Sequence, residues 1–230
     1  MEVLKRVERK HDLEELQRLQ TDIASKVILE DCFKKPIKIV TGFDLAYLER
    51  ESIAAAVTFD YDTLQIIEKK TIKERTTFPY IPTFLSFREG PIIIKLVQKL
   101  KIKPDMIMLD SQGISHPLFC GCASYVGVLI EKPAIGVAKS KLCGEITENP
   151  RKNGEWISLR YQGRKVGAVL LSKRRCNPIF VSPGHMITIE TAVNIVKHFL
   201  VGYKIPEPTR LAHNFANKIK KDLSLSRKKE

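Results

Sequence analysis

The sequence predicts an α/β fold in which helices flank a mixed β-sheet, and three observations support this. Three short segments of strand character, separated by polar turns, come early in the chain, which is typical of an antiparallel three-strand meander. From about residue 88 onward, amphipathic segments alternate with short apolar ones, which is typical of helices and parallel strands joined by right-handed crossovers. A chain of 230 residues without internal repeats or flexible linkers has the length of one domain.

The N-terminal part of the chain predicts one helix and then the meander. Residues 12–27 carry apolar side chains three or four positions apart with charges between them, which indicates an amphipathic helix. Residues 36–46, 52–59 and 64–72 have the length and composition of strands. Because the connections between these strands are short and polar, we expect neighbours to run antiparallel.

The middle of the chain predicts two helices that alternate with two strands. Helices are expected at about residues 88–100 and 118–130, and strands at residues 106–110 and 134–138. Each strand follows a helix, so right-handed crossovers would make these strands parallel.

A polar, turn-rich stretch at residues 149–163 comes before a strand at residues 164–171. Residues 156–159 are its expected hairpin partner, and residues 178–181 add a short strand. We expect these segments to extend the sheet.

The last part of the chain predicts a turn, a helix and a tail. Ser182-Pro183-Gly184 has proline and glycine in the middle of an expected turn. Residues 188–200 predict a capped amphipathic helix, and a basic tail follows it. Residues 224–230 have the composition of a disordered terminus.

Positive charge dominates the composition. The chain has 39 Lys and Arg against 26 Asp and Glu, a formal net charge of +13. Such a charge attracts polyanions, and nucleic acid is the obvious candidate. A basic protein without that partner is the alternative, which charge alone leaves open.

The cysteines indicate a reduced, intracellular protein. The five are odd in number and lack the paired spacings of zinc sites: Cys32, Cys120, Cys122, Cys143 and Cys176. No apolar run reaches membrane-spanning length, and the first residues lack the apolar core of a signal peptide. We therefore expect a cytoplasmic protein without a membrane partner. Because no exposed apolar stripe is left over, a monomer is expected.

Three carboxylates stand out as candidate metal ligands. Asp44 interrupts the first apolar strand, Asp110 ends the strand at residues 106–110, and Glu89 begins a predicted helix. If the first and fourth strands lie side by side, the two aspartates would face one site. Clustered carboxylates need a cation, and oxygen ligands suit Mg²⁺ or Mn²⁺. Helix capping is the alternative explanation, and it fits Asp44 least well.

Six segments of the sequence carry a family resemblance. They are TGFDLAY (41–47), FPYIPTFLSFREG (78–90), LDSQGISHPLFCGCASYVGV (109–128), IGVAKSKLCGE (135–145), PIFVSPGH (178–185) and PEPTRLAH (206–213). In this order and spacing the chain resembles the endonuclease V, or deoxyinosine 3′ endonuclease, family over nearly its whole length. The resemblance implies a ribonuclease-H-like fold, a single catalytic domain at residues 1–223, and Asp44, Glu89 and Asp110 as the metal-binding catalytic set.

The resemblance assigns a DNA wedge to Pro79, Tyr80, Ile81 and Pro82, here called the wedge segment. In this family the wedge enters the duplex beside the lesion. Two prolines stiffen a loop, and an aromatic ring between them can stack where a base has flipped out. Without the resemblance, the segment would be interpreted as a rigid turn before a helix.

The resemblance also implies a pocket for the flipped base, in which glycine backbone amides contact the hypoxanthine edge. Its expected residues are Thr83, Leu85, Ser111, Gly113, His116, Gly121 and Gly136. Three positions depart from the family pattern: Thr83 replaces the glycine after the wedge, Ser111 begins a loop that is usually glycine-rich, and Leu118 follows His116-Pro117. These changes bear on lesion selectivity more than on catalysis. His116 could equally anchor the loop by hydrogen bonds.

Two further residues complete the catalytic set that the resemblance implies. Lys139 would lie near the scissile phosphate and stabilise its negative charge, with an ordinary surface lysine as the alternative. His213 would orient or deprotonate the attacking water, or bind a second metal ion.

The implied reaction is hydrolysis of the second phosphodiester bond 3′ to deoxyinosine in DNA, with Mg²⁺ and also with Mn²⁺, leaving 3′-hydroxyl and 5′-phosphate ends. Two other functions stay open at this point. One is an inosine-directed ribonuclease, because inosine also occurs in RNA. The other is a non-catalytic nucleic-acid-binding module, which the charge permits and which the position of Asp44 disfavours.

Overall fold

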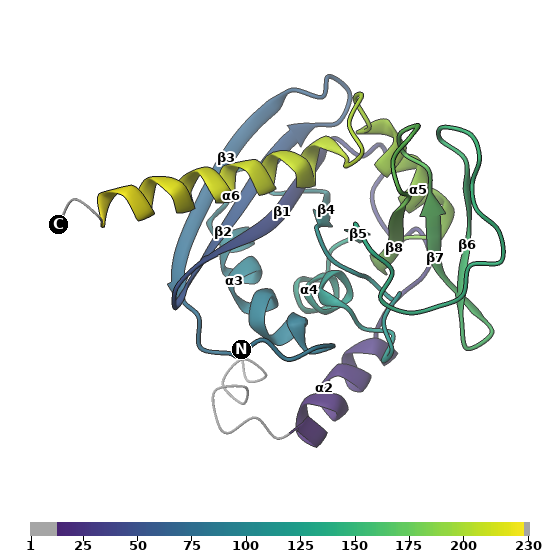
Figure 1. Cartoon of the computed structure of the whole chain (residues 1–230), viewed down its shortest axis with the longest axis horizontal. Helices are drawn as coiled ribbons and strands as arrows, with labels where there is room; N and C mark the ends of the chain where they lie inside the picture. Colours follow the sequence, from purple (N-terminus) through teal and green to yellow (C-terminus); the bar gives the residue numbers. More distant parts are fainter. Residues whose placement is uncertain (1–12, 228–230) are drawn as a thin grey trace.

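The computed structural model describes residues 13–227 of the chain, and an eight-stranded sheet lies at its centre (Figure 1). The strands are β1 (Ile39–Leu48), β2 (Glu51–Asp60), β3 (Ile66–Arg75), β4 (Met106–Leu109), β5 (Ala134–Ala138), β6 (Trp156–Tyr161), β7 (Arg164–Leu170) and β8 (Ile179–His185). The helices are α2 (Leu13–Ser25), α3 (Leu85–Lys99), α4 (Cys122–Ile130), α5 (Ile189–His198) and α6 (Glu207–Ser226).

The sheet is mixed, and its strand order is β3-β2-β1-β4-β5-β8-β7-β6. The first three strands form the predicted antiparallel meander. Strand β4 is parallel to β1, and β5 is parallel to β4, as the helix–strand alternation predicts. Strands β8, β7 and β6 then extend the sheet in antiparallel pairs. The predicted α/β class with a mixed sheet is therefore confirmed.

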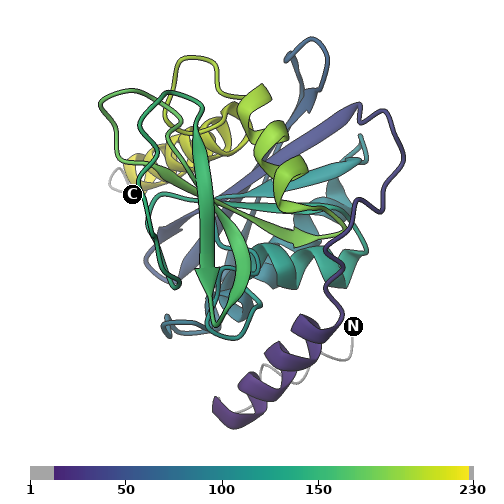
Figure 2. The same ribbon diagram turned by 90° about the vertical axis from the view of Figure 1, so that its right-hand side faces the viewer.

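Helices cover both faces of the sheet, and the side-chain alternation of the strands decides which residue meets which helix. Helices α3 and α4 pack on one face, where Phe43 and Leu109 are buried. Helices α5 and α6 pack on the other face, where Val40 and Met108 are buried. Figure 1 shows α6 lying across β1 and β2, and Figure 2 shows α2 at the opposite end of the molecule from α5 and α6. Because Phe43 faces α3 and α4, the next residue, Asp44, faces α6.

The sequence pattern predicts no helix after residue 200, whereas the structure has helix α6 over most of that stretch. Its buried positions are small or proline, including Pro208, Ala212 and Ala216, so the large apolar side chains that reveal a helix in a sequence are few. The helix includes residues 224–226, for which composition predicts disorder. The remaining tail residues, 228–230, lie outside the described part of the chain.

The predicted turn at residues 182–184 is also wrong, because these residues belong to β8. Pro183 pairs with Ile135 beside an irregularity in the register of β5 and β8. Proline has no N–H to donate to a sheet, and such irregularities are where sheets tolerate it. The Pro183 carbonyl instead accepts from the N–H of Ile114 at 2.9 Å, which ties a loop to this strand.

Two helix starts differ from the prediction. Helix α3 begins at Leu85, before the predicted start at residue 88, so Glu89 lies in its second turn and not at its start. Helix α4 begins at Cys122, because residues 118–121 form a loop in which Phe119 has a positive φ of 51°. The earlier start of α3 turns Glu89 toward the sheet rather than leaving it as a cap.

Candidate active site

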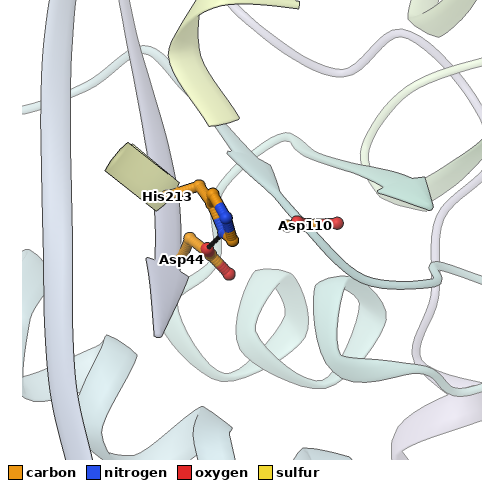
Figure 3. Close-up of side chains that lie close together, drawn as sticks. All are labelled: Asp44, Asp110 and His213. Atoms are coloured by element: carbon orange, nitrogen blue, oxygen red, sulfur yellow. Dashed lines mark hydrogen bonds and ion pairs between the residues drawn. The ribbon is translucent and has the colours of Figure 1, made fainter. Parts of the chain in front are cut away.

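Asp44, Asp110 and His213 lie together although they are far apart in the sequence (Figure 3). One ligand atom from each side chain falls within 4.8 Å of the other two, and we call this group the acidic cluster. Strand pairing brings the aspartates together, because Leu109 pairs with Phe43 and the N–H of Asp110 donates to the Phe43 carbonyl at 3.2 Å. The condition for one shared site, that the first and fourth strands lie side by side, is met by the pairing of β1 with β4.

His213 reaches the cluster because α6 packs very closely on β1. A Cβ atom at Gly42 would lie 2.1 Å from the carbonyl carbon of Pro208, in the first turn of α6. Any residue other than glycine at position 42 would therefore push the helix away. Seated this way, α6 places Nδ1 of His213 at 2.6 Å from Oδ2 of Asp44, and the Asn217 amide lies 3.3 Å from Nε2. The imidazole is thus held between a carboxylate and an amide.

The electrostatics of the cluster favour a bound cation. The pKa of Asp44 is raised to about 6: burial and the nearby Asp110 carboxylate raise it, and the hydrogen bond with His213 opposes the rise. Two carboxylates that repel each other in a partly buried site are stabilised by a divalent cation, and oxygen and imidazole ligands suit such an ion. The residues present therefore fit a metal ion.

Lys139 follows β5 and pairs with the cluster. Its ammonium lies 2.5 Å from Oδ2 of Asp110, and about half of the lysine side chain is exposed. Since one end of this lysine touches the cluster and the side chain stays accessible, it is placed to contact an anionic substrate as well.

Glu89 lies beside the acidic cluster but its carboxylate is not one of the atoms within 4.8 Å. The Tyr47 hydroxyl donates to Oε1 of Glu89 at 2.8 Å. The pKa of Glu89 is raised to about 7: burial is the largest cause, the charges of Asp44 and Asp110 add to the rise, and the Tyr47 hydrogen bond opposes it. The structure thus brings together two of the three predicted metal ligands, Asp44 and Asp110, and adds His213 to them. Glu89 lies next to this group but outside it.

Tyr47 was not among the residues that the sequence singled out. It comes three positions after Asp44 in β1, and the Arg88 guanidinium stacks over its ring at 4.5 Å. An aromatic hydroxyl shortly after a strand carboxylate is a weak signal, since strand tyrosines are common. Only the tertiary packing of α3 on the sheet reveals its contact with Glu89.

Comparison with known proteins identifies the family. The Endonuclease V family profile matches residues 21–214, which is most of the chain. The chain belongs to the endonuclease V family. Endonuclease V of Dictyoglomus thermophilum is 42% identical over 205 residues, covering 89% of this chain and 90% of that protein.

Solved structures agree with this assignment. Endonuclease V of Streptomyces avermitilis superposes with a TM-score of 0.86 at 32% identity, covering 92% of this chain and 94% of that one. Endonuclease V of Ciona intestinalis, in complex with a 24mer DNA containing an inosine followed by a ribo-adenosine, has a TM-score of 0.81 at 28% identity. That match covers 93% of this chain and 100% of the Ciona chain.

As a member of the endonuclease V family, the chain is a nuclease that hydrolyses phosphodiester bonds. The acidic cluster agrees with the metal dependence of the family. No helix within residues 13–227 is long and apolar enough to span a membrane.

Replacing Tyr47 by Phe should move the acidic limb of the pH–activity profile to higher pH. In the wild type, the hydrogen bond from Tyr47 stabilises the charged form of Glu89. Without that bond, the pKa of the Glu89 carboxylate rises. A hydrogen bond to a charged group contributes about 1.5 kcal/mol, which corresponds to about one pKa unit. The measurement is the rate of metal-dependent cutting between pH 5 and 9. Tyr61→Phe is the control, and an unshifted profile in Tyr47→Phe would contradict the role of this hydroxyl.

The wedge segment of this endonuclease V projects from the surface. Tyr80 is 69% exposed, Pro79 and Pro82 are exposed, and Ile81 is partly buried. The buried rings of Phe78 and Phe84 flank the segment and anchor it in the core beneath α3. An exposed ring on a proline-stiffened loop is suited to stacking on bases.

Replacing Tyr80 by Ala should weaken binding to an inosine-containing duplex about tenfold, because stacking of a base on an aromatic ring contributes roughly 1–3 kcal/mol. Binding to an undamaged duplex should change much less. Fluorescence anisotropy with both duplexes measures the two affinities. Equal losses on both would argue that Tyr80 is not a wedge.

A carbonyl clamp fixes the end of the wedge segment. The Thr83 carbonyl accepts from Nε2 of His116 at 2.9 Å and from the Gln20 amide at 3.1 Å, and Thr83 has a positive φ of 70°. The Leu118 N–H donates to Nδ1 of His116, so Nε2 carries the proton. Burial lowers the pKa of His116 to about 4, which keeps it neutral. His116 therefore lies behind the loop as an anchor.

Gln20 is a second residue that the sequence interpretation missed. It is fully buried in α2 and also donates to the Cys120 carbonyl at 2.6 Å, so one amide joins the wedge segment to the loop before α4. A signal was available, because Gln20 falls on the same helical face as Leu16 and Ile23. A polar residue on an apolar helical face needs a partner when it is buried.

The residues expected to form the base pocket surround the loop that follows Asp110. Leu85 is partly buried at the start of α3, and Ser111 is buried with no hydrogen-bond partner for its hydroxyl among the described residues. A Cβ atom at Gly113 would lie 2.1 Å from the Pro183 carbonyl oxygen. The Gly113 N–H donates to the Ser182 hydroxyl at 2.7 Å, and the Gly121 N–H donates to the Gly113 carbonyl at 2.8 Å.

The amides of Gly113 and Gly121 are thus already bonded within the protein. Gly136 lies inside β5, between β4 and β8, where a Cβ atom would lie 2.5 Å from the Gly113 nitrogen. In this structure the three glycines allow close packing of backbone segments, and their amides are not free to contact a base edge.

Proposed function

We propose that this protein is a magnesium-dependent DNA repair endonuclease that hydrolyses the second phosphodiester bond 3′ to deoxyinosine, leaving 3′-hydroxyl and 5′-phosphate ends. The observation that carries the proposal is the acidic cluster of Asp44, Asp110 and His213, with Lys139 in contact with it. The inosine-containing DNA bound to the Ciona relative supports the choice of substrate.

Asp44 and Asp110 would hold the metal ion, with Glu89 as a third carboxylate nearby. Mg²⁺ suits carboxylate ligands with room for water and phosphate, and Mn²⁺ is expected to support activity as well. When bound, the ion would lower the pKa of a coordinated water and neutralise charge on the scissile phosphate.

The protein's own side chains do the rest. His213 bonds to Asp44 and is placed to orient the attacking water or accept its proton. Lys139 is paired with Asp110, and its positive charge would stabilise the negative charge that develops on the phosphate oxygens during the reaction. The exposed Tyr80 enters the duplex beside the lesion, and the base flips toward the loop that includes Ser111 and Gly113.

A nicking assay tests the proposal. A labelled duplex with one deoxyinosine is incubated with Mg²⁺ or with chelator, and the cut is mapped to the nucleotide. We expect a metal-dependent nick one nucleotide beyond the inosine and no nick in the undamaged duplex. Equal cutting of duplexes with and without inosine, or cutting in the presence of chelator, would overturn the proposal.

A second candidate function is an inosine-directed ribonuclease. The bound strand in the Ciona relative has a ribo-adenosine directly after the inosine, so that endonuclease V accommodates a ribonucleotide there. Strands with deoxyinosine or riboinosine, each followed by a deoxy- or ribonucleotide, separate the two candidates by their relative cutting rates. The third possibility, a non-catalytic binding module, is contradicted by membership in a nuclease family.

We also propose that residues 1–223 form one catalytic domain that works as a monomer in the cytoplasm. The charge of the chain supports binding of a polyanion by that single domain. Analytical sedimentation of the protein, alone and with the duplex, measures its mass, and we expect the mass of one chain.

A further inference from the structure

An open recess of about 490 Å³ lies between the end of the meander and the wedge segment. Its walls come from the turn between β1 and β2, from the end of β3, and from the residues that lead into the wedge. They include Arg50, Arg75, Thr76, Thr77, Pro79 and Arg88. We call this the arginine recess.

Local hydrogen bonds fix the two outer arginines near each other. The Thr76 N–H donates to the Arg50 carbonyl at 2.7 Å, and the hydroxyls of Ser52 and Thr76 lie 2.6 Å apart. Arg75 pairs with Glu51, the residue after Arg50. The backbone positions of Arg50 and Arg75 are therefore close together at one corner of the sheet and are fixed by hydrogen bonds.

The charges around the recess leave these arginines without an acidic partner. Glu49 also lines the recess, but Arg227 contacts it at 3.3 Å. Glu51 is contacted by Arg227 and by Lys73. Within residues 13–227, no carboxylate forms an ion pair with Arg50 or Arg75. Because the nearby acids are neutralised by other cations, the recess keeps a positive charge that an anion could bind.

Arg88 adds a third guanidinium that the protein already holds in place. It donates to the Phe78 carbonyl at 2.6 Å and stacks on the Tyr47 ring, so its charge is fixed at the inner wall. Pro79, the first residue of the wedge segment, forms part of the same recess. A duplex opened by the wedge must therefore pass close to these arginines.

The position of the recess relative to the acidic cluster agrees with one bound duplex. Leu48, at the end of β1, is four residues beyond Asp44. At about 3.3 Å per residue this is about 13 Å, the length of roughly four base pairs of a duplex that lies along β1. In Figure 1 the turn between β1 and β2 and the end of α6 lie on the same side of the molecule, at the left.

We propose that the arginine recess binds one or two backbone phosphates of the nucleic acid, about four base pairs from the bond that is cut. The inference rests on the proposed function, since it concerns how the same substrate is held. Phosphodiester oxygens match the forked guanidinium groups and the threonine hydroxyls at the recess wall.

The test is the salt dependence of binding by the Arg50→Ala/Arg75→Ala variant. Each phosphate contact contributes about 0.9 to the slope of log Kd against log salt concentration, so the slope should fall by about 1 to 2. Affinity for the inosine-containing duplex at 0.1 M salt should fall roughly tenfold. Anisotropy in chelator measures both quantities without cutting.

The matched control is Arg174→Ala/Arg175→Ala, which removes the same charge from two exposed residues between β7 and β8. The control should leave the slope nearly unchanged. If both double variants lose the same slope, general charge explains the effect and the recess is not a site. If the Arg50→Ala/Arg75→Ala variant keeps the wild-type slope, the proposal is overturned.

Neutral methylphosphonate linkages, placed one at a time along both strands, identify the bound phosphate. For the wild type, a neutral linkage at the recess should cost the same affinity that the Arg50→Ala/Arg75→Ala variant loses, and the variant should be indifferent to that linkage. If every neutral linkage, including the one at the recess, still lowers the affinity of the Arg50→Ala/Arg75→Ala variant, the assignment is contradicted. Failure of the proposed function would look different, because the wild type would then not cut at inosine.

Discussion

The Asp110→Ala variant should lose cleavage of the inosine-containing duplex by about a thousandfold or more, while its affinity for that duplex is kept. Asp110 supplies an oxygen ligand to the acidic cluster and holds Lys139 at 2.5 Å, so its removal disturbs both metal binding and the phosphate contact. Affinity should be kept because the variant has one negative charge less near a polyanion.

Nicking rates and anisotropy measure the two properties separately. Asp62→Ala removes the same charge from an exposed turn between β2 and β3 and serves as the control. Cleavage that persists in Asp110→Ala at high Mg²⁺ would mean that this carboxylate is not required.

The second large effect concerns stability without metal. The folded protein holds the Glu89 proton to a pKa of about 7, whereas the ordinary value is 4.5. Since the unfolded chain releases that proton more easily, the free energy of unfolding of the metal-free protein falls as pH rises from about 4.5 to 7. The cost above pH 7 is about 3 kcal/mol, at 1.36 kcal/mol per pKa unit.

The Glu89→Gln variant should remove this cost. Its amide oxygen can still accept from Tyr47 and carries no charge, so the metal-free variant should be about 3 kcal/mol more stable than the wild type at pH 8 and nearly equal at pH 4. Urea unfolding in chelator at the two pH values measures the difference. A variant less stable than the wild type at pH 8 would show that the charged form of Glu89 does not destabilise the folded protein.

Much of the architecture could be predicted from periodicity alone. The meander and the two parallel strands follow from local pattern, and Asp44 comes close to Asp110 once the first and fourth strands are taken as neighbours. These features depend on interactions that repeat along the sequence, so a single chain reveals them.

Features that depend on tertiary packing were missed. Helix α6 buries small residues such as Ala212 and Ala216, and small buried residues leave little trace in a hydropathy pattern. Pro183 is tolerated within β8 because of a register irregularity that no sequence pattern signals. The family resemblance supplied His213, but only the packing of Gly42 against Pro208 explains how that histidine reaches Asp44.

The seat of α6 on Gly42 has a consequence for synthesis of the protein. The acidic cluster takes its members from residues 44, 110 and 213, so the last of them is translated long after the first. A nascent chain on the ribosome can form the meander early, but it cannot complete the cluster until α6 has left the exit tunnel and docked on β1. Cutting that depends on the cluster therefore cannot begin before His213 has been translated and α6 has docked.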